Sequence, residues 1–283
     1  MLTREILQSK LADLEKTYVD FCLEQFGSWR DFAHATRRIY KGEAVDEADV
    51  PASYLHEFRL LREVLKMEAT GKFDWTNPVL KESFSHFVTS DYYKIWGATI
   101  TEISLRLAQL SGVKTLVEIG AGKGNLTEIM ITRLDKAGMT IPLIVTDVSP
   151  AVLENIGKLK NRFQHMPVET MPWDIKEQPP AELVQMIQHP CLLYERASIM
   201  YSNIASIENM ASMADMVVFG DMFNYTGELD AYDDIARKIG GEPLFYSRIR
   251  PLMEKCFQDH FMFDLRAQEA LGYPSTTILI GWR

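Results

Sequence analysis

Residues Leu116 to Asn125 read LVEIGAGKGN, a short apolar run that ends in a glycine-rich turn. The run is rich in strand-forming side chains and too short for a helix, and the glycines break it abruptly. Apolar side chains then recur at helical spacing from Leu126 to Leu134, which predicts a helix. A strand, a glycine turn and a helix N-terminus together indicate a ligand site, because glycine lets backbone N–H groups approach a ligand closely. A tight turn without a ligand is the alternative that this stretch leaves open.

A second apolar run, Leu143 to Thr146, ends in Asp147 and predicts a buried strand. An acidic side chain at the end of such a strand can accept hydrogen bonds from both hydroxyls of a cofactor ribose. Asp147 could instead cap the next helix, although Ser149, with Pro150 after it, is better placed for that role.

The spacing of the glycines separates two candidate cofactors. A dinucleotide fingerprint has the form G-x-G-x-x-G, but Asn125 occupies the place of its third glycine. The pattern E-x-G-x-G-x-G, which begins at Glu118, resembles the first motif of the class I S-adenosylmethionine-dependent methyltransferases, and LIVTDVSPAVLENI resembles their second. The resemblance implies a Rossmann-like α/β fold and S-adenosylmethionine as cofactor, with Glu118 holding the methionine ammonium and Asp147 binding the adenosyl ribose.

The resemblance also extends to the segment FQHMPVETMPW, which is similar to the family segment that borders the adenine. Where the family usually has an acidic residue, this chain has Pro167, so Glu169 is either an adenine contact or an exposed loop charge. The cofactor-binding residues expected from the three segments are Glu118, Gly120, Ala121, Gly122, Gly124, Asn125, Asp147, Val148, Val168 and Glu169.

Composition narrows the class of substrate. A chain of 283 residues with 47% hydrophobic residues can bury a full core. Its net charge of −9 argues against a general affinity for nucleic acid and favours a small-molecule acceptor. Arg37, Arg38 and Lys41 could form a local basic patch, or they could lie on a solvated helix face.

The cysteines and histidines do not follow a metal-site pattern. Cys22, Cys191 and Cys256 lie far apart without C-x-x-C spacing, and the histidines show no paired spacing, so we expect neither a metal nor a disulfide framework. The N-terminal segment is charged throughout, and no apolar run reaches transmembrane length. We therefore expect a cytoplasmic protein without a membrane partner.

The order of the predicted elements divides the chain into two regions. Residues 1–110 form an N-terminal helical cap or substrate region, and residues 111–283 form the Rossmann-like cofactor-binding domain. We expect a helical insertion at about 174–212, which either shapes substrate choice or packs on the flank of the sheet. Strands are expected at Ala214 to Phe219 and Leu244 to Ile249, and the C-terminal tail should form an antiparallel hairpin at the edge of a mostly parallel sheet. The apolar stripe of the N-terminal helices could pair two subunits or pack on its own domain.

The acceptor side of the site is expected after the strand that ends at Phe219. Asp221 is the candidate catalytic residue, with Asn224 and Tyr225 positioned to hold the acceptor. Asp221 as an ordinary loop residue is an equal alternative. Tyr92 and Tyr93 are either lid residues over the acceptor or part of an aromatic core.

The chemistry implied by the resemblance needs little covalent help from the protein. Methyl transfer to a small molecule is an in-line displacement, and a base is required only if the acceptor must lose a proton. Two other hypotheses remain. One is an NAD(P)-dependent oxidoreductase, against which Asn125 and the C-terminal hairpin weigh, and the other is a cofactor-binding protein that does not methylate.

Overall fold

The computed structural model describes residues 3–24, 31–32, 34–35, 38–39, 43–70, 78–87, 89, 91–175, 177–195, 204–219, 250–265 and 276–283. Within them lies one seven-stranded sheet with the strand order β3-β2-β1-β4-β5-β7-β6. Its strands are β1 (Thr115–Ile119), β2 (Leu143–Asp147), β3 (Val168–Pro172), β4 (Cys191–Glu195), β5 (Met216–Phe219), β6 (Asp259–Leu265) and β7 (Thr276–Trp282).

The sheet is parallel from β3 to β5 and ends in antiparallel pairs, with β7 between β5 and β6. This confirms the predicted α/β fold, including the antiparallel C-terminal hairpin at the sheet edge. All residues of β1, β2 and β4 are buried, because helices cover both faces of a parallel sheet.

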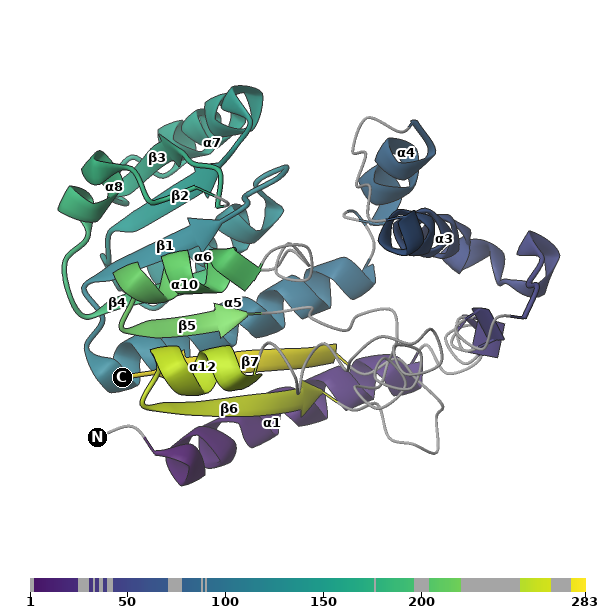
Figure 1. The fold of residues 1–283 in the computed structure, drawn as a ribbon, viewed down its shortest axis with the longest axis horizontal. Coiled ribbons are helices and arrows are strands. Elements are labelled where there is room, and N and C mark those ends of the chain that lie inside the picture. The colour runs from purple at the N-terminus through teal and green to yellow at the C-terminus, as the bar shows by residue number, and fades with distance from the viewer. Residues whose placement is uncertain are drawn as a thin grey trace.

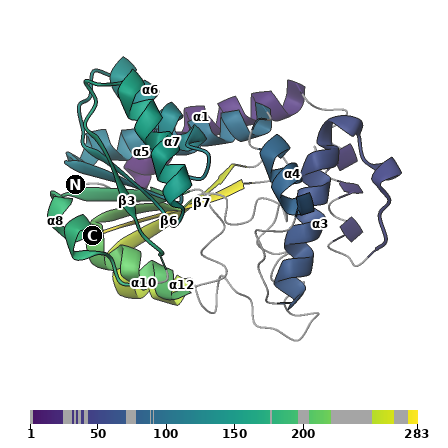
Figure 2. The same ribbon diagram turned by 90° about the horizontal axis from the view of Figure 1, so that it is seen from above.

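Helices form a layer on each face of the sheet (Figure 2). One layer contains α1 (Arg4–Glu24), α5 (Asp91–Ser111), α6 (Asn125–Lys136) and α7 (Pro150–Arg162). The other contains α8 (Ala181–Met186), α10 (Ile204–Met213) and α12 (Arg250–Cys256). Each layer buries its own apolar core against alternate side chains of the central strands.

A group of helices lies apart from both layers, beyond the carboxyl ends of the parallel strands (Figure 1). It consists of η1 (Glu47–Asp49), η2 (Ala52–Tyr54), α3 (Leu55–Thr70) and α4 (Pro78–Phe87). Both α1 and α5 belong instead to the layer on the sheet. The first part of the chain therefore contributes both to the sheet's own packing and to a separate helical group. The division at residue 110 stays a prediction.

The predicted helical insertion at 174–212 was wrong in one respect: it contains β4, a central strand of the sheet. The sequence CLLYE at 191–195 is buried on both faces and has no polar alternation. A short, continuous apolar run cannot be distinguished from a buried helical segment by periodicity alone. The strand expected at Ala214 to Phe219 is confirmed as β5, and Leu244 to Ile249 lies outside the described residues.

Candidate cofactor site

The candidate site lies where the strand order reverses. β1 and β4 are neighbours in the sheet although they are not consecutive along the chain. Ile119, the last residue of β1, is level with Glu195 at the end of β4 and with Thr146 in β2. In open α/β sheets, ligands bind outside the carboxyl ends of the strands at this reversal.

Backbone hydrogen bonds fix the turn after β1 to the neighbouring strand. The N–H groups of Gly120 and Ala121 donate to the carbonyl oxygen of Thr146, with N···O distances of 2.9 and 3.1 Å. The hydroxyl of Thr146 donates in turn to the carbonyl oxygen of Glu118, at 2.9 Å. The turn is thus held in place before any ligand arrives.

Gly122 and Gly124 serve the turn in different ways. Their φ angles are +55° and +81°, in the left-handed region that other residues resist. A Cβ on Gly124 would lie 2.5 Å from Cδ1 of Ile156 in α7, whereas a Cβ on Gly122 would meet nothing within 4 Å. Gly124 therefore allows α6 and α7 to pack closely, and Gly122 borders open space. α6 begins at Asn125, directly after the turn, so its N-terminus lies at this same edge. Gly124 has no side chain that could cap the N–H groups of the first helical turn.

Asp147 ends β2 directly beside the turn. Its Oδ2 accepts a hydrogen bond from the N–H of Gly122 at 3.0 Å, and its Oδ1 accepts one from the N–H of Ser149 at 2.9 Å. Each carboxylate oxygen keeps a second lone pair, so the group can also accept from ligand hydroxyls. Ser149 is the N-cap residue of α7, without a side-chain hydrogen bond, and Pro150 is at the first helical position. The next residue after Asp147, Val148, is 63% exposed and offers an apolar surface at the same edge.

Glu118 lies beneath the turn and is only 1% exposed. Its Oε1 accepts a hydrogen bond from the hydroxyl of Thr127 at 3.0 Å, and its Oε2 accepts one from the hydroxyl of Tyr194 at 2.9 Å. Burial raises the pKa of Glu118 to about 7, and the two hydroxyl donors oppose that rise. Glu118 therefore joins β1, β4 and α6, and its predicted contact with the cofactor ammonium stays a prediction.

Glu195 was missed by the sequence analysis because its strand was predicted as helix. It is fully buried at the end of β4, and neither of its carboxyl oxygens has a hydrogen-bond partner in the structure as described. Burial raises the pKa of Glu195 well above its ordinary value. A buried strand that ends in an acidic residue is the signal that could have found it, as it found Asp147.

The prediction for Val168 and Glu169 needs a correction. Both lie at the amino end of β3, where Val168 is paired with Leu143, whereas Asp147 at the carboxyl end is paired with Pro172. Val168 is 1% exposed, and Glu169 forms an exposed ion pair with Lys160, at 3.0 Å. The match to the family segment was shifted, because the strand starts at Val168 and the carboxyl edge begins only after Pro172.

Asp174 is the acidic residue that does follow β3 at the carboxyl edge. The N–H of Trp173, immediately before it, donates to the carbonyl oxygen of Asp147 at 3.2 Å. Asp174 is half-buried and close in sequence to this contact. We therefore propose Asp174 in place of Glu169 as a cofactor contact at this edge of the sheet.

The expected acceptor-side residues are not covered by the structure. Asp221, Asn224 and Tyr225 lie outside the described residues. Tyr92 and Tyr93 lie in the first turn of α5, but their side chains are outside the described part of the chain. These assignments stay predictions.

The separate helical group touches the glycine turn. Nζ of Lys123 donates to the hydroxyl of Ser85 in α4, at 2.6 Å. His86, the next residue of α4, stacks on His56 of α3 with ring centroids 3.6 Å apart. α3 and α4 are thus connected with each other and with the turn. The role of this region as a cap stays a prediction.

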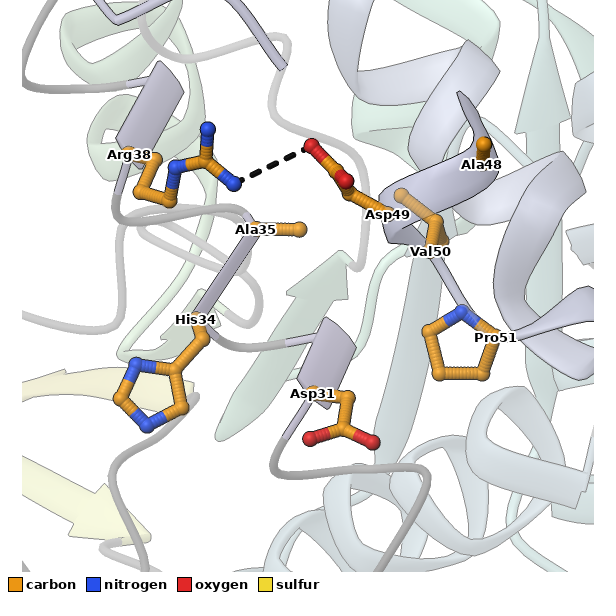
Figure 3. Close-up of a pocket in the computed structure, with 8 residues that line it drawn as sticks. All are labelled: Asp31, His34, Ala35, Arg38, Ala48, Asp49, Val50 and Pro51. Carbon is orange, nitrogen blue, oxygen red and sulfur yellow. Dashed lines mark hydrogen bonds and ion pairs between the residues drawn. The ribbon is translucent and has the colours of Figure 1, made fainter. Parts of the chain in front are cut away.

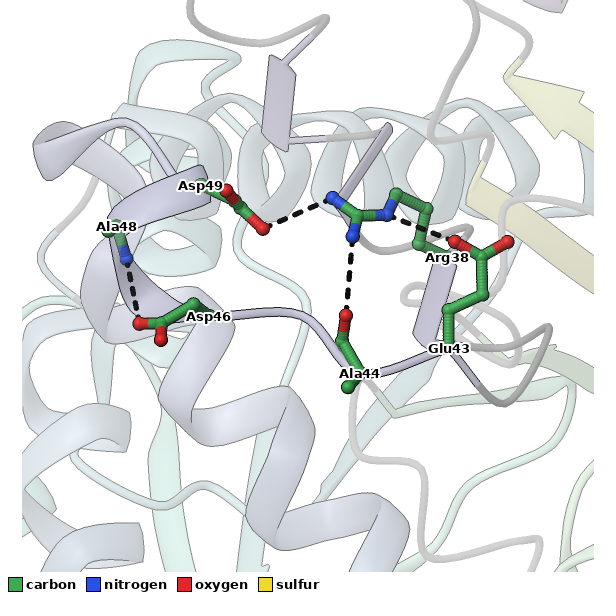
Figure 4. A network of polar contacts seen from close by, with 6 residues as sticks. All are labelled: Arg38, Glu43, Ala44, Asp46, Ala48 and Asp49. Carbon is green, nitrogen blue, oxygen red and sulfur yellow. Dashed lines mark hydrogen bonds and ion pairs between the residues drawn. The ribbon is translucent and has the colours of Figure 1, made fainter.

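A cavity of about 620 Å³ lies within the N-terminal region rather than at the sheet edge. Arg38 at its wall donates to Glu43, to Asp49 and to the carbonyl oxygen of Ala44, at 3.1 to 3.2 Å (Figure 4). These contacts neutralise Arg38 locally, so it does not add to a basic patch, while Arg37 and Lys41 lie outside the described residues. The cavity (Figure 3) is lined by Asp31, His34, Ala35, Arg38, Ala48, Asp49, Val50 and Pro51.

The described residues contain no group of three or more His, Cys, Asp or Glu side chains that could hold a metal ion. None of the described helices is both long enough and apolar enough to cross a membrane.

Comparison with solved structures reveals the same architecture over almost the whole chain. The citrinin polyketide synthase CMeT domain has a TM-score of 0.60 at 14% identity, with 100% of this chain and 98% of that chain covered. The CurJ carbon methyltransferase has a TM-score of 0.58 at 12% identity, with 99% of each chain covered. The DszA carbon methyltransferase has a TM-score of 0.57 at 14% identity, with 88% and 69% covered. The chain has a class I methyltransferase fold.

Sequence comparison gives a shorter match. No protein-family model matches the chain. The non-reducing polyketide synthase sorB of Penicillium rubens is 31% identical over 94 residues, which are 32% of this chain and 3% of the synthase. The non-reducing polyketide synthase sor2 of Hypocrea jecorina is 29% identical over 96 residues, which are 32% of this chain and 4% of that synthase. The chain thus spans only a small part of the length of these curated relatives.

Proposed function

We propose that the protein is an S-adenosylmethionine-dependent methyltransferase. The observation that carries this proposal is the joined arrangement of the glycine turn and Asp147, in which the N–H of Gly122 donates to the Asp147 carboxylate at 3.0 Å. The turn, the N-terminus of α6 and an acidic residue at the end of β2 meet at the strand-order reversal. The class I methyltransferase fold of the chain supports the same cofactor.

The residues present suit such a cofactor by their chemistry. Asp147 would accept hydrogen bonds from the ribose hydroxyls, while exposed Val148 would contact the apolar face of the adenine. Gly122 would allow close approach of the backbone, because open space surrounds the position that a side chain would take. Bound S-adenosylmethionine would supply a methyl group on a sulfonium leaving group.

The protein's own contribution would be positioning and exclusion of water. Aligning an acceptor with a methyl donor is worth about 7–11 kcal/mol in favourable systems. α3 and α4 lie beyond the carboxyl edge and contact the turn through Ser85 and Lys123, so this helical group is the part suited to cover the acceptor.

We further propose that the acceptor is a carbon atom of a small molecule. Two of the three solved structures compared above are called carbon methyltransferases, and the two relatives by sequence are polyketide synthases. We take the acceptor to be a carbon acid next to a carbonyl group, because such a carbon becomes a nucleophile when it loses a proton, and it would then require a base.

Calorimetric titration tests the cofactor. S-adenosylmethionine and S-adenosylhomocysteine should bind with micromolar affinity, whereas NAD and NADP should not. Asp147→Ala should abolish binding. The matched control Glu169→Gln should leave binding unchanged, because Glu169 lies near the amino end of β3, away from the carboxyl edge where Asp147 lies. Absence of adenosyl binding, or binding of a nicotinamide nucleotide, would overturn the proposal.

A labelled methyl donor tests the acceptor. The protein is incubated with a panel of small carbon acids, phenols and amines, and methylated products are identified by mass spectrometry. Methylation confined to carbon acids is the expected result. Transfer only to oxygen or nitrogen would reject the carbon acceptor without affecting the cofactor assignment.

A further inference from the structure

Glu195 occupies an unusual place in the sheet. It is the last residue of β4 and is level with Ile119, the residue from which the glycine turn starts. On its other side it is level with Phe219, the last residue of β5. It therefore lies at the reversal of the strand order, at the edge where the candidate cofactor site is built.

The comparison with Glu118 makes this position informative. Both carboxyl groups are buried near the ends of adjacent strands, with 1% exposure for Glu118, the last but one residue of β1, and 0% for Glu195. Glu118 accepts a hydrogen bond at each oxygen, from Thr127 and Tyr194. Neither oxygen of Glu195 has a partner in the described structure. The same chemical group is thus fully satisfied on one face of the sheet and left without a partner on the other.

The surroundings of Glu195 are apolar. Side chains alternate along a strand, so Glu195 is on the same face of β4 as Leu193 and Cys191. The flanking side chains on this face are Ile119 and Phe219. The described helices packed against this face contribute one titratable side chain, the partly buried thiol of Cys256 in α12, whose pKa burial raises. Their fully buried core residues do not titrate: Leu183 from α8, Met210, Ala211 and Met213 from α10, and Met253 from α12.

The other titratable groups near this face lie at the opposite end of β4 or at the surface. The Cys191 thiol lies at the other end of β4, and burial raises its pKa to about 12. Asp215, at that same end, accepts from the backbone N–H of Cys191 and contacts His189. Glu208 of α10 and Lys255 of α12 pair with each other at the surface, at 2.8 Å. Burial alone raises the pKa of Glu195 in the described structure. A carboxyl that is fully buried among apolar side chains without a hydrogen-bond partner favours its neutral form.

A buried carboxyl without a hydrogen-bond partner destabilises a protein unless another group offsets the loss of hydration. The proposed cofactor offers such a group, because its amino-acid portion carries an ammonium and a sulfonium. A cation next to a carboxyl stabilises the charged form and lowers the pKa, so the arrival of the cation would release the proton.

We propose that Glu195, rather than Glu118, is the counter-charge for the cationic amino-acid portion of the cofactor, and that it gives up its proton to solvent when the cofactor binds. This inference rests on the proposed function. The proton balance is simple: the neutral carboxyl becomes a carboxylate, and one proton passes to the buffer for each cofactor bound.

Calorimetric titration in two buffers of different ionisation enthalpy measures the number of protons released. The experiment is done at pH 6.5, where the amino group of the ligand, with an ordinary pKa of about 7.7–8.0, is already charged. Wild-type protein should release up to one proton with S-adenosylmethionine and with S-adenosylhomocysteine, which retains the ammonium. 5′-Methylthioadenosine, which has neither cation, should release none.

Three variants locate the source of the proton. Glu195→Gln should lose the release and weaken S-adenosylmethionine binding by about tenfold to 100-fold, the range for a hydrogen bond to a charged group. Glu57→Gln, which removes a carboxyl that is 5% exposed in α3, is the matched control and should behave like the wild type. Glu118→Gln should retain the release. Thermal unfolding of each variant confirms that it is folded.

Each outcome decides the matter. Release that persists in Glu195→Gln, release that disappears in Glu118→Gln alone, or equal release with 5′-methylthioadenosine would each overturn the assignment to Glu195. If the wild type binds no adenosyl compound, the proposed function itself fails. Normal binding by the wild type and by Glu195→Gln alike would leave the cofactor assignment standing and reject only the role of Glu195.

Discussion

Alanine at position 124 should destabilise the protein more than alanine at position 122, although both replace a glycine of the same turn. Gly122 and Gly124 have φ angles of +55° and +81°, so each alanine would incur backbone strain of about 1–2 kcal/mol. Only at Gly124 would the new Cβ meet other atoms, at 2.5 Å from Cδ1 of Ile156 and 3.3 Å from Cδ1 of Leu159. Cδ1 is the end of the Ile156 side chain, which is fully buried and must shift to admit the new Cβ, so overpacking adds about 1–3 kcal/mol.

Urea unfolding, followed by tryptophan fluorescence, measures the difference. Gly122→Ala should lower the free energy of unfolding by about 1–2 kcal/mol, and Gly124→Ala by about 2–5 kcal/mol, with unchanged dependence on urea. In a chain of this size each kcal/mol corresponds to about 2 °C in the midpoint of thermal unfolding.

The same pair of variants separates folding from binding. Gly122 borders open space at the candidate site, so its alanine should weaken S-adenosylmethionine binding despite the smaller loss of stability. Gly112→Ala, with a φ of +62° and also no neighbour within 4 Å, is the control for strain away from the site. Equal destabilisation by Gly122→Ala and Gly124→Ala would refute the argument that Gly124 exists for the contact between α6 and α7.

Three more predictions concern carboxylates in the sheet or directly after one of its strands. Burial raises the pKa of Glu118 from 4.5, its value in the unfolded chain, to about 7 in the folded protein. The stability that this carboxyl contributes is therefore fully present below pH 4.5 and is lost as the pH rises through about 7, by about 3 kcal/mol in total. Urea unfolding of Glu118→Gln between these pH values should show a shallower fall than the wild type, and an unchanged slope would contradict the buried position. Tyr194→Phe leaves Oε2 of Glu118 without its donor and should lower the free energy of unfolding by about 1–3 kcal/mol, measured with urea; a loss below about 0.5 kcal/mol would show that this hydrogen bond does little. Asp174→Asn should weaken S-adenosylmethionine binding in calorimetry whereas Glu169→Gln should not, and the reverse result would restore the original assignment of Glu169.

Patterns within a few residues of each other were enough to predict the glycine turn and its flanking elements. The run before Gly120 and the helical spacing after Asn125 correctly predicted β1 and α6. The apolar run that ends in Asp147 correctly predicted β2, and the structure brings that carboxylate into contact with the turn. These elements are determined locally, because strand propensity, glycine conformations and helical periodicity all act over short distances.

Predictions that depended on register or on burial from both sides were less accurate. Glu169 was assigned to the adenine because the sequence does not indicate which residue of β3 is level with Asp147. β4 was predicted as helix because helices cover both of its faces, which removes the alternation by which an exposed strand is recognised.

The sequence by itself determined the α/β class, the antiparallel C-terminal hairpin and the candidate cofactor turn, since each of these depends on short-range patterns in the chain. Only the tertiary structure decided which carboxylates lie at the reversal of the strand order and how each is satisfied. Glu118 and Glu195 are 77 positions apart in the sequence, yet they lie near the ends of neighbouring strands. The pleat of the sheet directs them to opposite faces, where Glu118 meets two hydroxyl donors and Glu195 has no hydrogen-bond partner in the described structure.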